Sequence, residues 1–303
     1  MTTTTDQTTR TDIYTRVTSR IVEELERGTR PWLKPWNAEH AAGRITRPLR
    51  HNGQKYSGIN IITLWMSAEM SGFVSPFWLT FNQARELGAF VKKGEHGSPV
   101  VYASKFTKKD KTEAGDEIDQ EIPFLKQYTV FNADQVEGLP GYFYELAKAV
   151  QTQPLQRIEQ AERFFANTKA DIRYGGNRAY YAFEADYVRM PPFETFRDSE
   201  SHAATLAHEL THWTRHTSRL NRELGRKKWG DEGYAMEELV AELGSAFLCA
   251  DLHITPEVRE DHASYIESWL KVLKEDKRAV FQAASYASRA VDFLHGLQPQ
   301  PAA

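Results

Sequence analysis

The segment HELTH at residues 208–212 contains two histidines four residues apart, with a glutamate directly after the first. Residues i and i+4 of a helix lie on the same face, so the imidazoles of His208 and His212 would converge on one point beside the helix. Glu209 follows His208 and can hold a water molecule next to that point. This HExxH spacing is typical of a metal site in which the glutamate acts as a general base. The alternative is a helix that carries two surface histidines and no ion.

A metal site that catalyses hydrolysis needs a third protein ligand and one open position. A histidine six residues after His212 is one option, but that position holds Ser218. His216 lies one turn further along the helix than His212, where the helix bends its side chain away from the same ion. We therefore assign His216 a structural or solvent-exposed role.

The segment EELVAE at residues 237–242 supplies carboxylates on a later amphipathic helix. Glu238 and Glu242 share a face that continues through small residues from Ser245 onward, which would let another helix approach closely. Carboxylates on a semi-buried face need partners, and a metal ion and the second ring nitrogen of a ligating histidine would supply them. We predict that Glu238 is the third ligand and that Glu242 accepts the histidine's hydrogen bond, with Glu237 as the alternative ligand. The other interpretation is three solvated glutamates.

Such a site would hydrolyse a peptide bond with one divalent metal ion, which we expect to be Zn²⁺, with Mn²⁺ or another divalent ion as the alternative. The ion would lower the pKa of a bound water toward ~7 and polarise the carbonyl. Glu209 would take the proton of that water and pass it to the leaving amine. Tyr234 and Arg215 are candidate donors to the oxyanion. A strand edge within residues 179–190 could hold an extended peptide. The candidate contacts to that peptide are Tyr180, Tyr181, Arg189, Met190 and Pro191.

A second group of residues, between positions 28 and 55, combines basic side chains with aromatic ones and contains one acid. Cations neutralise phosphates and aromatic rings stack on unpaired bases, so this mixture favours single-stranded nucleic acid over duplex. The candidate DNA-binding residues are Arg30, Trp32, Lys34, Trp36, Arg44, Arg47, Arg50, Lys55 and Tyr56, extended by Lys92 and Lys93. Further aromatic residues follow at Phe77, Trp78, Phe81 and Phe90. The alternative is that the tryptophans anchor a core and the charges only solvate a loop.

The charge of the chain is unevenly distributed, although the net charge is only −3. Residues 1–111 contain 17 Lys/Arg and 10 Asp/Glu, whereas the remaining residues contain 21 and 31. A basic first part and an acidic second part indicate two modules with different partners. The basic part suits a polyanion.

The composition also indicates a compartment. The 303 residues are 41% hydrophobic, so a packed core is expected and wholesale disorder is excluded. Cys249 is the single cysteine, which excludes an internal disulfide and a cysteine-based zinc finger and fits a reducing compartment. The N-terminus lacks the apolar segment of a secretory signal, and the longest apolar-rich run, residues 59–66, is too short to cross a membrane. We expect a soluble cytoplasmic protein without a membrane partner.

Helices and strands are both predicted for the first module. The apolar spacing after Asp12 predicts a helix that Gly28 ends, and a second helix is expected to end at Gly72. A short strand or turn and a third helix should follow within residues 78–88. The segments 98–106 and 124–136 should be β-rich, and the charged residues between them should form a hairpin loop.

The second module is predicted to be mostly helical, and the fold class of the chain is α+β. Two or three short antiparallel strands are expected within residues 172–192. The predicted helices span 153–168, 199–217, 233–251, 255–275 and 277–295. The predicted limits are a disordered tail at 1–11, a first domain at 12–137, a linker at 138–152, a second domain at 153–296 and a disordered tail at 297–303.

Several blocks of the sequence together resemble the antirestriction proteins of the ArdC type. These blocks are YTRVTSRIVEELERGTRPWLKPW, YSGINIITLW, TFNQARELGAFVKKGEHGSPVVY, YTVFNADQVEGLP, LAHELTHWT and EELVAELGSAFL, and the resemblance extends over residues 12–295. It implies a single-stranded-DNA-binding domain at 12–137, a zincin-like metallopeptidase domain of the gluzincin type at 153–296, and protection of incoming plasmid DNA from host restriction during conjugation. The family's metal motif corresponds to His208, Glu209, His212 and the glutamates of EELVAE.

Three hypotheses follow for the function. The first is a protein that binds single-stranded DNA and is an active metallopeptidase, with a restriction subunit or a protein attached to transferred DNA as the substrate. The second is a DNA-binding protein whose metal site is structural or vestigial, but Glu209 argues against it because a structural site needs no base. The third is a hydrolase of DNA, which a single-ion site disfavours because phosphodiester cleavage commonly uses two metals.

Overall fold

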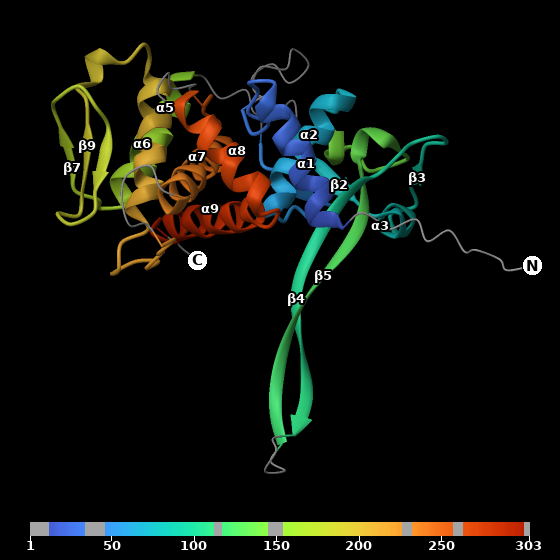
Figure 1. Ribbon diagram of the computed structural model, residues 1–303. Helices are drawn as coiled ribbons and strands as arrows, with labels where there is room; N and C mark the ends of the chain where they lie inside the picture. The colour runs from blue at the N-terminus through green and yellow to red at the C-terminus, as the bar shows by residue number, and fades with distance from the viewer. Residues whose placement is uncertain are drawn as a thin grey trace, which may run out of the picture. The chain divides into compact units, whose positions relative to one another are not determined.

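The computed structural model describes residues 12–33, 46–111, 117–144, 154–225, 232–256 and 263–299. The chain divides into two compact units, which Figure 1 shows with their elements labelled. The first, called the helical unit below, comprises Met1–Asn37 together with Thr152–Ala303. The second, called the sheet unit, comprises Ala38–Gln151. Each unit contains helices and strands, so the predicted α+β class is confirmed.

Four strands form the main sheet of the sheet unit, in the order β1-β2-β5-β4. Their bounds are Leu49–Arg50 for β1, Phe77–Leu79 for β2, Ser98–Lys111 for β4 and Glu117–Asn132 for β5. Strands β1 and β2 are parallel, whereas the other neighbours are antiparallel. Strands β4 and β5 form a long hairpin (Figure 1).

The pairing of β4 with β5 is continuous from Ser98↔Val130 to Lys111↔Glu117. The prediction of a charged loop directly after residue 106 was therefore wrong, because both strands continue through these residues. The backbone hydrogen bonds of an antiparallel ladder form between polar residues as well as apolar ones, so a fall in apolar content does not by itself end a strand.

The helices predicted for this part of the chain are confirmed. Helix α2 spans Ile59–Ser71 and ends at Gly72, whose φ of 69° is the left-handed conformation that glycine adopts without steric cost. Helix α3 spans Phe81–Glu86 and begins with a capping box in which Thr80 and Gln83 exchange side-chain-to-backbone hydrogen bonds. A second, two-stranded sheet pairs β3 with β6, and the 3-10 helix η3 precedes β6. The bounds of these elements are Phe90–Val91 for β3, Ala133–Gln135 for η3 and Val136–Glu137 for β6.

The core of the sheet unit includes residues that were predicted to lie in a linker. Leu139 and Phe143 pack in one apolar cluster with Phe77 and Leu79. The Ser75 hydroxyl also donates to the Phe143 carbonyl at 2.8 Å. Residues 138–144 therefore belong to this unit, because Leu139 and Phe143 are buried in its core although the glycines and proline around them resemble a linker.

Six helices are described in the helical unit. Their bounds are Ile13–Glu26 for α1, Pro154–Asn167 for α5, Ser199–Trp213 for α6, Glu232–Leu252 for α7, Ala263–Glu275 for α8 and Ala279–Gly296 for α9. Helix α7 packs against α6, α8 and α9, and it is buried along almost its whole length, as expected of a helix that is apolar on most sides. No helix in the described part of the chain is both long enough and apolar enough to cross a membrane.

A three-stranded sheet in the order β7-β9-β8 completes the helical unit, together with the 3-10 helix η4. The bounds are Ile172–Tyr174 for β7, Tyr180–Ala182 for β8, Tyr187–Met190 for β9 and Phe193–Thr195 for η4. Strands β8 and β9 are antiparallel as predicted, but β7 and β9 are parallel. Because β9 is the central strand and Met190 is fully buried, the segment Arg189–Pro191 does not form the free edge that was predicted to hold a peptide.

Helix α1 belongs to the helical unit, although it is separated from the rest of that unit by more than a hundred residues of sequence. Ile21 and Leu25 are buried, and the Thr18 hydroxyl donates to the Lys277 carbonyl at 2.7 Å. Tyr14 packs on Phe281, with ring centroids 4.6 Å apart. The predicted domain limits placed this helix in one domain with the residues that follow it. The compact units differ from those limits, because the C-terminal helices cover the apolar face of α1.

Candidate metal centre

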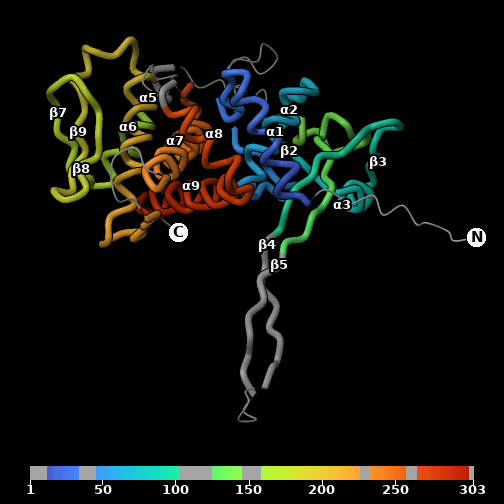
Figure 2. The backbone as a smooth tube through the Cα atoms, viewed as in Figure 1, coloured from blue at the N-terminus to red at the C-terminus, as the bar shows by residue number. Residues whose placement is uncertain are grey.

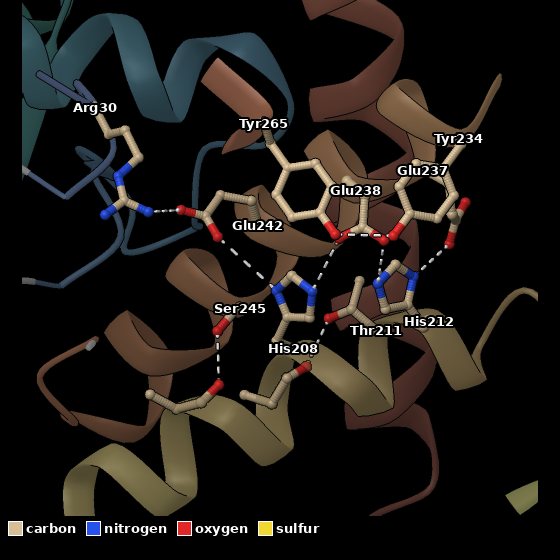
Figure 3. Close-up of polar contacts among 12 residues, drawn as sticks. Arg30, His208, Thr211, His212, Tyr234, Glu237, Glu238, Glu242, Ser245 and Tyr265 are labelled. Atoms are coloured by element: carbon tan, nitrogen blue, oxygen red, sulfur yellow. Dashed lines mark hydrogen bonds and ion pairs between the residues drawn. The ribbon is translucent and has the colours of Figure 1, made fainter. Parts of the chain in front are cut away.

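The centre lies where α6 and α7 approach each other closely. A Cβ atom placed on Gly244 of α7 would lie 2.5 Å from the Thr211 methyl group of α6, so only glycine fits at this contact. One residue further along α7, the Ser245 hydroxyl donates to the Ala204 carbonyl at 3.0 Å. The expected close approach of a second helix to the small residues of α7 is confirmed. It brings the histidine face of α6 against the glutamates of α7 (Figure 3).

Two histidines and one glutamate form a compact donor group at this contact. The Glu238 carboxylate lies 3.6 Å from the Nε2 atom of His208 and 3.6 Å from the Nε2 atom of His212 (Figure 3). One donor atom from each of the three residues lies within 4.8 Å of the others, and all three residues are buried. Bonds of about 2.0–2.2 Å in a tetrahedral site place donor atoms roughly 3.3–3.6 Å apart, so the two contacts of Glu238 fit a shared ion.

The second ring nitrogen of each histidine faces another glutamate of α7. The Nδ1 atom of His212 lies 3.1 Å from the Glu237 carboxylate, within hydrogen-bond distance. The Nδ1 atom of His208 lies 3.9 Å from the Glu242 carboxylate, which is longer than a hydrogen bond. Glu242 thus faces a histidine as predicted, but the shorter contact is made by Glu237, which the sequence suggested only as an alternative ligand. Carboxylates in this position fix the orientation of a metal-binding imidazole.

Glu237 is itself held by Arg222, a residue that the sequence did not single out. The Arg222 guanidinium donates two hydrogen bonds to the Glu237 carboxylate, at 2.9 Å and 2.7 Å. It also donates to the Thr214 hydroxyl and the Thr211 carbonyl of the α6 end. Burial raises the pKa of Glu237, but these hydrogen bonds and the Arg222 charge outweigh it and lower that pKa to about 2. Nothing in the local sequence distinguishes Arg222 from the neighbouring arginines, because its role depends on the packing of α7.

Glu242 is held by Arg30 and Trp32, which the sequence assigned to DNA binding. The Arg30 Nη1 and Trp32 Nε1 atoms donate to the same Glu242 oxygen, at 2.8 Å and 3.3 Å. Trp32 also packs edge-on against Trp269, with ring centroids 5.7 Å apart. Arg30 and Trp32 were predicted to bind DNA, but both side chains are buried in the helical unit and are not accessible to DNA in this structure. DNA binding and core packing were the two alternatives predicted for the tryptophans, and the burial of Trp32 favours core packing.

Two tyrosine hydroxyls lie beside the donor group. Tyr234 of α7 and Tyr265 of α8 are joined by a hydrogen bond of 2.9 Å between their hydroxyl oxygens (Figure 3). Burial, followed by the charge of the Glu238 carboxylate, raises the pKa of Tyr234, so its hydroxyl stays protonated. The predicted oxyanion donor Tyr234 is therefore close to the site. Tyr265 was not predicted, because its helix gives no local signal for a contact with α7.

The other predicted residues lie as follows. Glu209 is buried on α6 directly after His208. His216 contacts the Ser218 hydroxyl and does not belong to the donor group. Arg215 lies over the ring of Phe183 at 4.9 Å. On the edge strand β8, Tyr180 is exposed and Tyr181 donates to Asp186. His216 thus lies outside the donor group, in agreement with the predicted structural or solvent-exposed role.

The charges of the donor group indicate a need for a cation. Burial lowers the pKa of His212, but the charge of Glu238 and the hydrogen bond to Glu237 outweigh it and raise that pKa to about 10. Burial raises the pKa of Glu238, but the two histidines outweigh it and lower that pKa. The three buried glutamates therefore favour a positive charge between them, which a protonated imidazole or a divalent ion can supply.

The predicted DNA-binding residues of the sheet unit fall into exposed and buried sets. Arg50, Lys55, Lys92 and Lys93 are exposed. Arg47 and Tyr56 are buried, and the Arg50 guanidinium lies 5.4 Å from the centre of the Tyr56 ring. Lys34, Trp36 and Arg44 lie outside the described residues. Of the downstream aromatic residues, Phe77 and Trp78 are buried, whereas Phe81 and Phe90 are exposed.

The fold and the donor group define the class of protein. Residues 159–286 match the family described as zincin-like metallopeptidase, and residues 11–131 match the N-terminal domain of the anti-restriction factor ArdC. The chain belongs to the family of ArdC-type antirestriction proteins, as the sequence blocks had indicated.

Individual relatives cover almost the whole chain. The protein y4eC of Sinorhizobium fredii is 44% identical over 97% of this chain and 96% of its own length. The crystal structure of the antirestriction protein ArdC from plasmid R388 is 43% identical and has a TM-score of 0.78 in its metal-free form, over 94% of this chain and 97% of that chain. Its Mn(II)-bound form has a TM-score of 0.76, over 94% of this chain and 98% of that chain. The DNA primase TraC of Escherichia coli is 37% identical over 93% of this chain, which spans only 27% of that protein.

Proposed function

We propose that the helical unit is a metal-dependent peptidase. The observation that carries this proposal is the buried group of His208, His212 and Glu238, with Glu209 next to it on the same helix. The three donors would hold one ion and leave a position open, which is the arrangement of a catalytic rather than a structural zinc site. When bound, a divalent ion supplies a water of lowered pKa and polarises the substrate carbonyl.

The residues of the chain would divide the reaction between them. Glu209 accepts the proton of the attacking water and transfers it to the leaving amine. The hydroxyls of Tyr234 and Tyr265 are donors that can stabilise the oxyanion, since burial and Glu238 keep Tyr234 protonated. The hydrogen bond with Glu237 holds the His212 ring in the orientation that ligation needs, and Glu242 faces the Nδ1 atom of His208 at 3.9 Å.

The ion would be Zn²⁺ or Mn²⁺. Two imidazoles and one carboxylate suit zinc, whereas the Mn(II)-bound form of the R388 relative favours manganese as a second candidate. Within the described ranges, the three residues of this group are the only candidate metal-binding cluster. A single ion fits amide hydrolysis better than phosphodiester cleavage, which commonly uses two metals.

We further propose that the sheet unit binds single-stranded DNA, and that both activities protect incoming plasmid DNA from host restriction in the cytoplasm. The match to the N-terminal domain of the ArdC factor supports this, as do the exposed side chains of Arg50, Lys55, Lys92 and Lys93. The substrate of the peptidase would be a restriction subunit or a protein attached to the transferred DNA. The alternative is protection by DNA binding alone, with a metal site that only holds α6 and α7 together.

Replacing Glu209 tests the peptidase. The wild-type protein and the Glu209→Gln variant, each loaded to one ion per chain, are incubated with a protein mixture, with and without single-stranded DNA, and new termini are counted by mass spectrometry. We expect cleavage by the wild type and a loss of roughly 10²–10⁴-fold in the variant. The exposed Glu184→Gln serves as the matched control and should cleave normally. A wild-type protein that binds one ion but cleaves nothing would favour the structural role.

The DNA binding is measured separately on the full-length protein by fluorescence anisotropy. We expect tighter binding of a single-stranded oligonucleotide than of a duplex of the same length, and an affinity that falls steeply with salt. A preference for duplex, or binding that does not depend on salt, would count against this part of the proposal.

A further inference from the structure

A hollow on the sheet unit has the features of a site for an unpaired base. Its volume is about 270 Å³, and residues of α2, α3, β4 and β5 contribute to its lining. Figure 2 shows the course of the backbone through these elements. The side chains that give it chemistry are those of Arg50, Thr80, Gln83, Tyr102 and Tyr128. Apart from Arg50, none of these residues was predicted to bind DNA.

The two tyrosines lie on one face of adjacent strands. Tyr128 is paired in register with Val100, and Tyr102 lies two residues beyond Val100, so Tyr102 and Tyr128 are diagonal neighbours with side chains on the same face. Diagonal neighbours are about 7–8 Å apart, which leaves room for one planar ring between them. Val100 and Val130 are buried and form the apolar floor of this face.

Both tyrosines are exposed to solvent, although large aromatic side chains are usually largely buried. The exposed fraction is 50% for Tyr102 and 44% for Tyr128. Within the described residues, neither ring stacks on another aromatic ring. Exposed and unstacked aromatic rings at a hollow provide the surface on which bases of a single strand stack.

A cation and an amide complete the rim. The Arg50 guanidinium lies over the buried ring of Tyr56, and no carboxylate of the described residues forms an ion pair with it. It can therefore bind a phosphate without breaking an internal pair. In the capping box, the Gln83 side chain accepts from the Thr80 backbone through its oxygen, which directs the amide nitrogen to other partners such as a base edge.

The wall of the hollow is fixed in position. The Asn60 amide of α2 donates to the Val101 carbonyl and accepts from the Val101 N–H, both at 2.8 Å. These two hydrogen bonds satisfy the backbone N–H and C=O groups of Val101, next to Tyr102 on the outer edge of β4, and connect this strand to α2. A preformed wall lowers the entropy cost of binding, because the site does not have to order itself around the ligand.

We infer that this hollow binds one nucleobase of single-stranded DNA, stacked on Tyr102 and Tyr128, with the adjoining phosphate on Arg50. The inference rests on the proposed DNA binding and assigns it to residues. A base in a duplex is stacked on both faces and paired along one edge, so it cannot enter. A neutral peptide could fill the hollow but would leave the Arg50 charge without an anion.

The test uses the full-length protein with Tyr102→Leu, Tyr128→Leu and the double variant, and Tyr142→Leu as the matched control. Tyr142 is also an exposed tyrosine of the sheet unit, but it lies outside the hollow. We expect the double variant to bind an oligothymidine roughly 5- to 150-fold more weakly, because stacking contributes about that factor per base. Tyr142→Leu and Tyr102→Phe should retain the wild-type affinity, since the first leaves the hollow intact and the second keeps the ring.

A second measurement distinguishes stacking from a change in folding. A strand in which the bases are replaced by abasic sugars should bind the wild type and the double variant equally, because only the phosphates then contribute. Arg50→Gln should reduce the slope of log affinity against log salt by about 0.7. If the wild type binds single-stranded DNA and the double variant binds it as well, the inference is overturned and the proposed DNA binding stands. If the wild type binds no single-stranded DNA, both are overturned.

Discussion

Arg30 and Arg50 belong to the same basic and aromatic-rich stretch of sequence, but the structure places them in opposite environments. Arg30 is buried in the helical unit with Glu242, and its neighbour Trp32 donates to the same carboxylate oxygen. Arg50 is exposed on the sheet unit and lies over Tyr56. The first arginine supports a metal centre, whereas the second is accessible to an anion. A similar local sequence therefore occupies two different environments.

The difference follows from the partners that each unit provides. Three buried glutamates of α7, one inside the donor group and two beside it, surround this centre, so a cation that packs against them becomes part of a fixed network. The hollow of the sheet unit is formed by apolar, hydroxyl and amide groups, which leave a cation at the rim available for a ligand. Burying a charge requires a partner of opposite sign, whereas an exposed charge is satisfied by water until a ligand arrives.

Replacing each arginine by methionine should separate the two environments most clearly. Arg30→Met removes the ion pair between Arg30 and the buried Glu242, and we expect a loss of about 3–5 kcal/mol in the free energy of unfolding. Arg50→Met removes an exposed charge and should change that free energy by less than about 0.5 kcal/mol. Denaturant unfolding of the full-length protein, followed by circular dichroism, measures both.

Metal and DNA titrations complete this comparison. Arg30→Met should weaken metal binding, because Glu242 faces His208, and should leave DNA binding unchanged. Arg50→Met should weaken DNA binding and leave metal binding unchanged. Equal losses of stability in the two variants would contradict the assignment of one arginine to the metal centre and the other to the surface.

Much of the donor group could be predicted because it depends on local geometry. The positions of His208, Glu209 and His212 follow from the helical repeat alone. Glu238 was identified from the same repeat on a second helix, and the structure places it between the two imidazoles. The helical repeat does not show how α6 packs against α7. The hydrogen bond with a histidine was therefore predicted for Glu242, and the one that Glu237 makes with His212 was missed.

The rest of the site depends on contacts between segments that are distant in sequence. Arg222 lies after the end of α6, and Tyr265 lies on α8, but both reach the centre only through the packing around α7. Helix α1 was recognised as a helix, whereas its membership of the helical unit depends on the apolar surface of the C-terminal helices. Periodicity identifies a buried face but does not identify which face covers it.

The pH dependence of stability provides a second way to distinguish the units. The pKa of His212 is about 10 in the folded chain, against about 6.5 when unfolded. Because the folded pKa is the higher one, this stabilisation is fully present below about pH 6.5 and is lost as the pH rises toward 10. We therefore expect the free energy of unfolding of the metal-free protein to fall between pH 7 and 9, by an amount on the order of a few kcal/mol.

The controls for this experiment are the stability of the metal-loaded protein, the affinity for single-stranded DNA and a variant of a histidine outside the donor group. An imidazole that holds an ion is neutral, so the metal-loaded protein should lose less stability over the same range. The affinity for single-stranded DNA should change little, since no histidine lines the hollow and burial raises the pKa of Tyr56 to about 12. His216→Asn should keep the wild-type pH dependence, because His216 lies outside the donor group. A metal-free protein of constant stability would contradict the protonation of His212.

The smallest expected effect concerns the contact between α6 and α7. Gly244→Ala places a methyl group 2.5 Å from the Thr211 methyl group, and Thr211 is held in place by a hydrogen bond of 2.8 Å to the Ala207 carbonyl. The helices must therefore separate slightly, and we expect a loss of about 1–3 kcal/mol in the free energy of unfolding. Gly296→Ala is the matched control, since no atom lies within 4 Å of the added carbon.

This substitution also tests whether the metal centre depends on the spacing of its two helices. The histidines are on α6 and the glutamates on α7, so a small separation moves the Nε2 atoms away from Glu238. We expect Gly244→Ala to lower metal affinity while DNA binding stays unchanged, because the hollow is formed within the sheet unit. A variant that loses stability but keeps its metal affinity would show that the donor group adjusts to the shift, and the close contact would then serve folding rather than ligation.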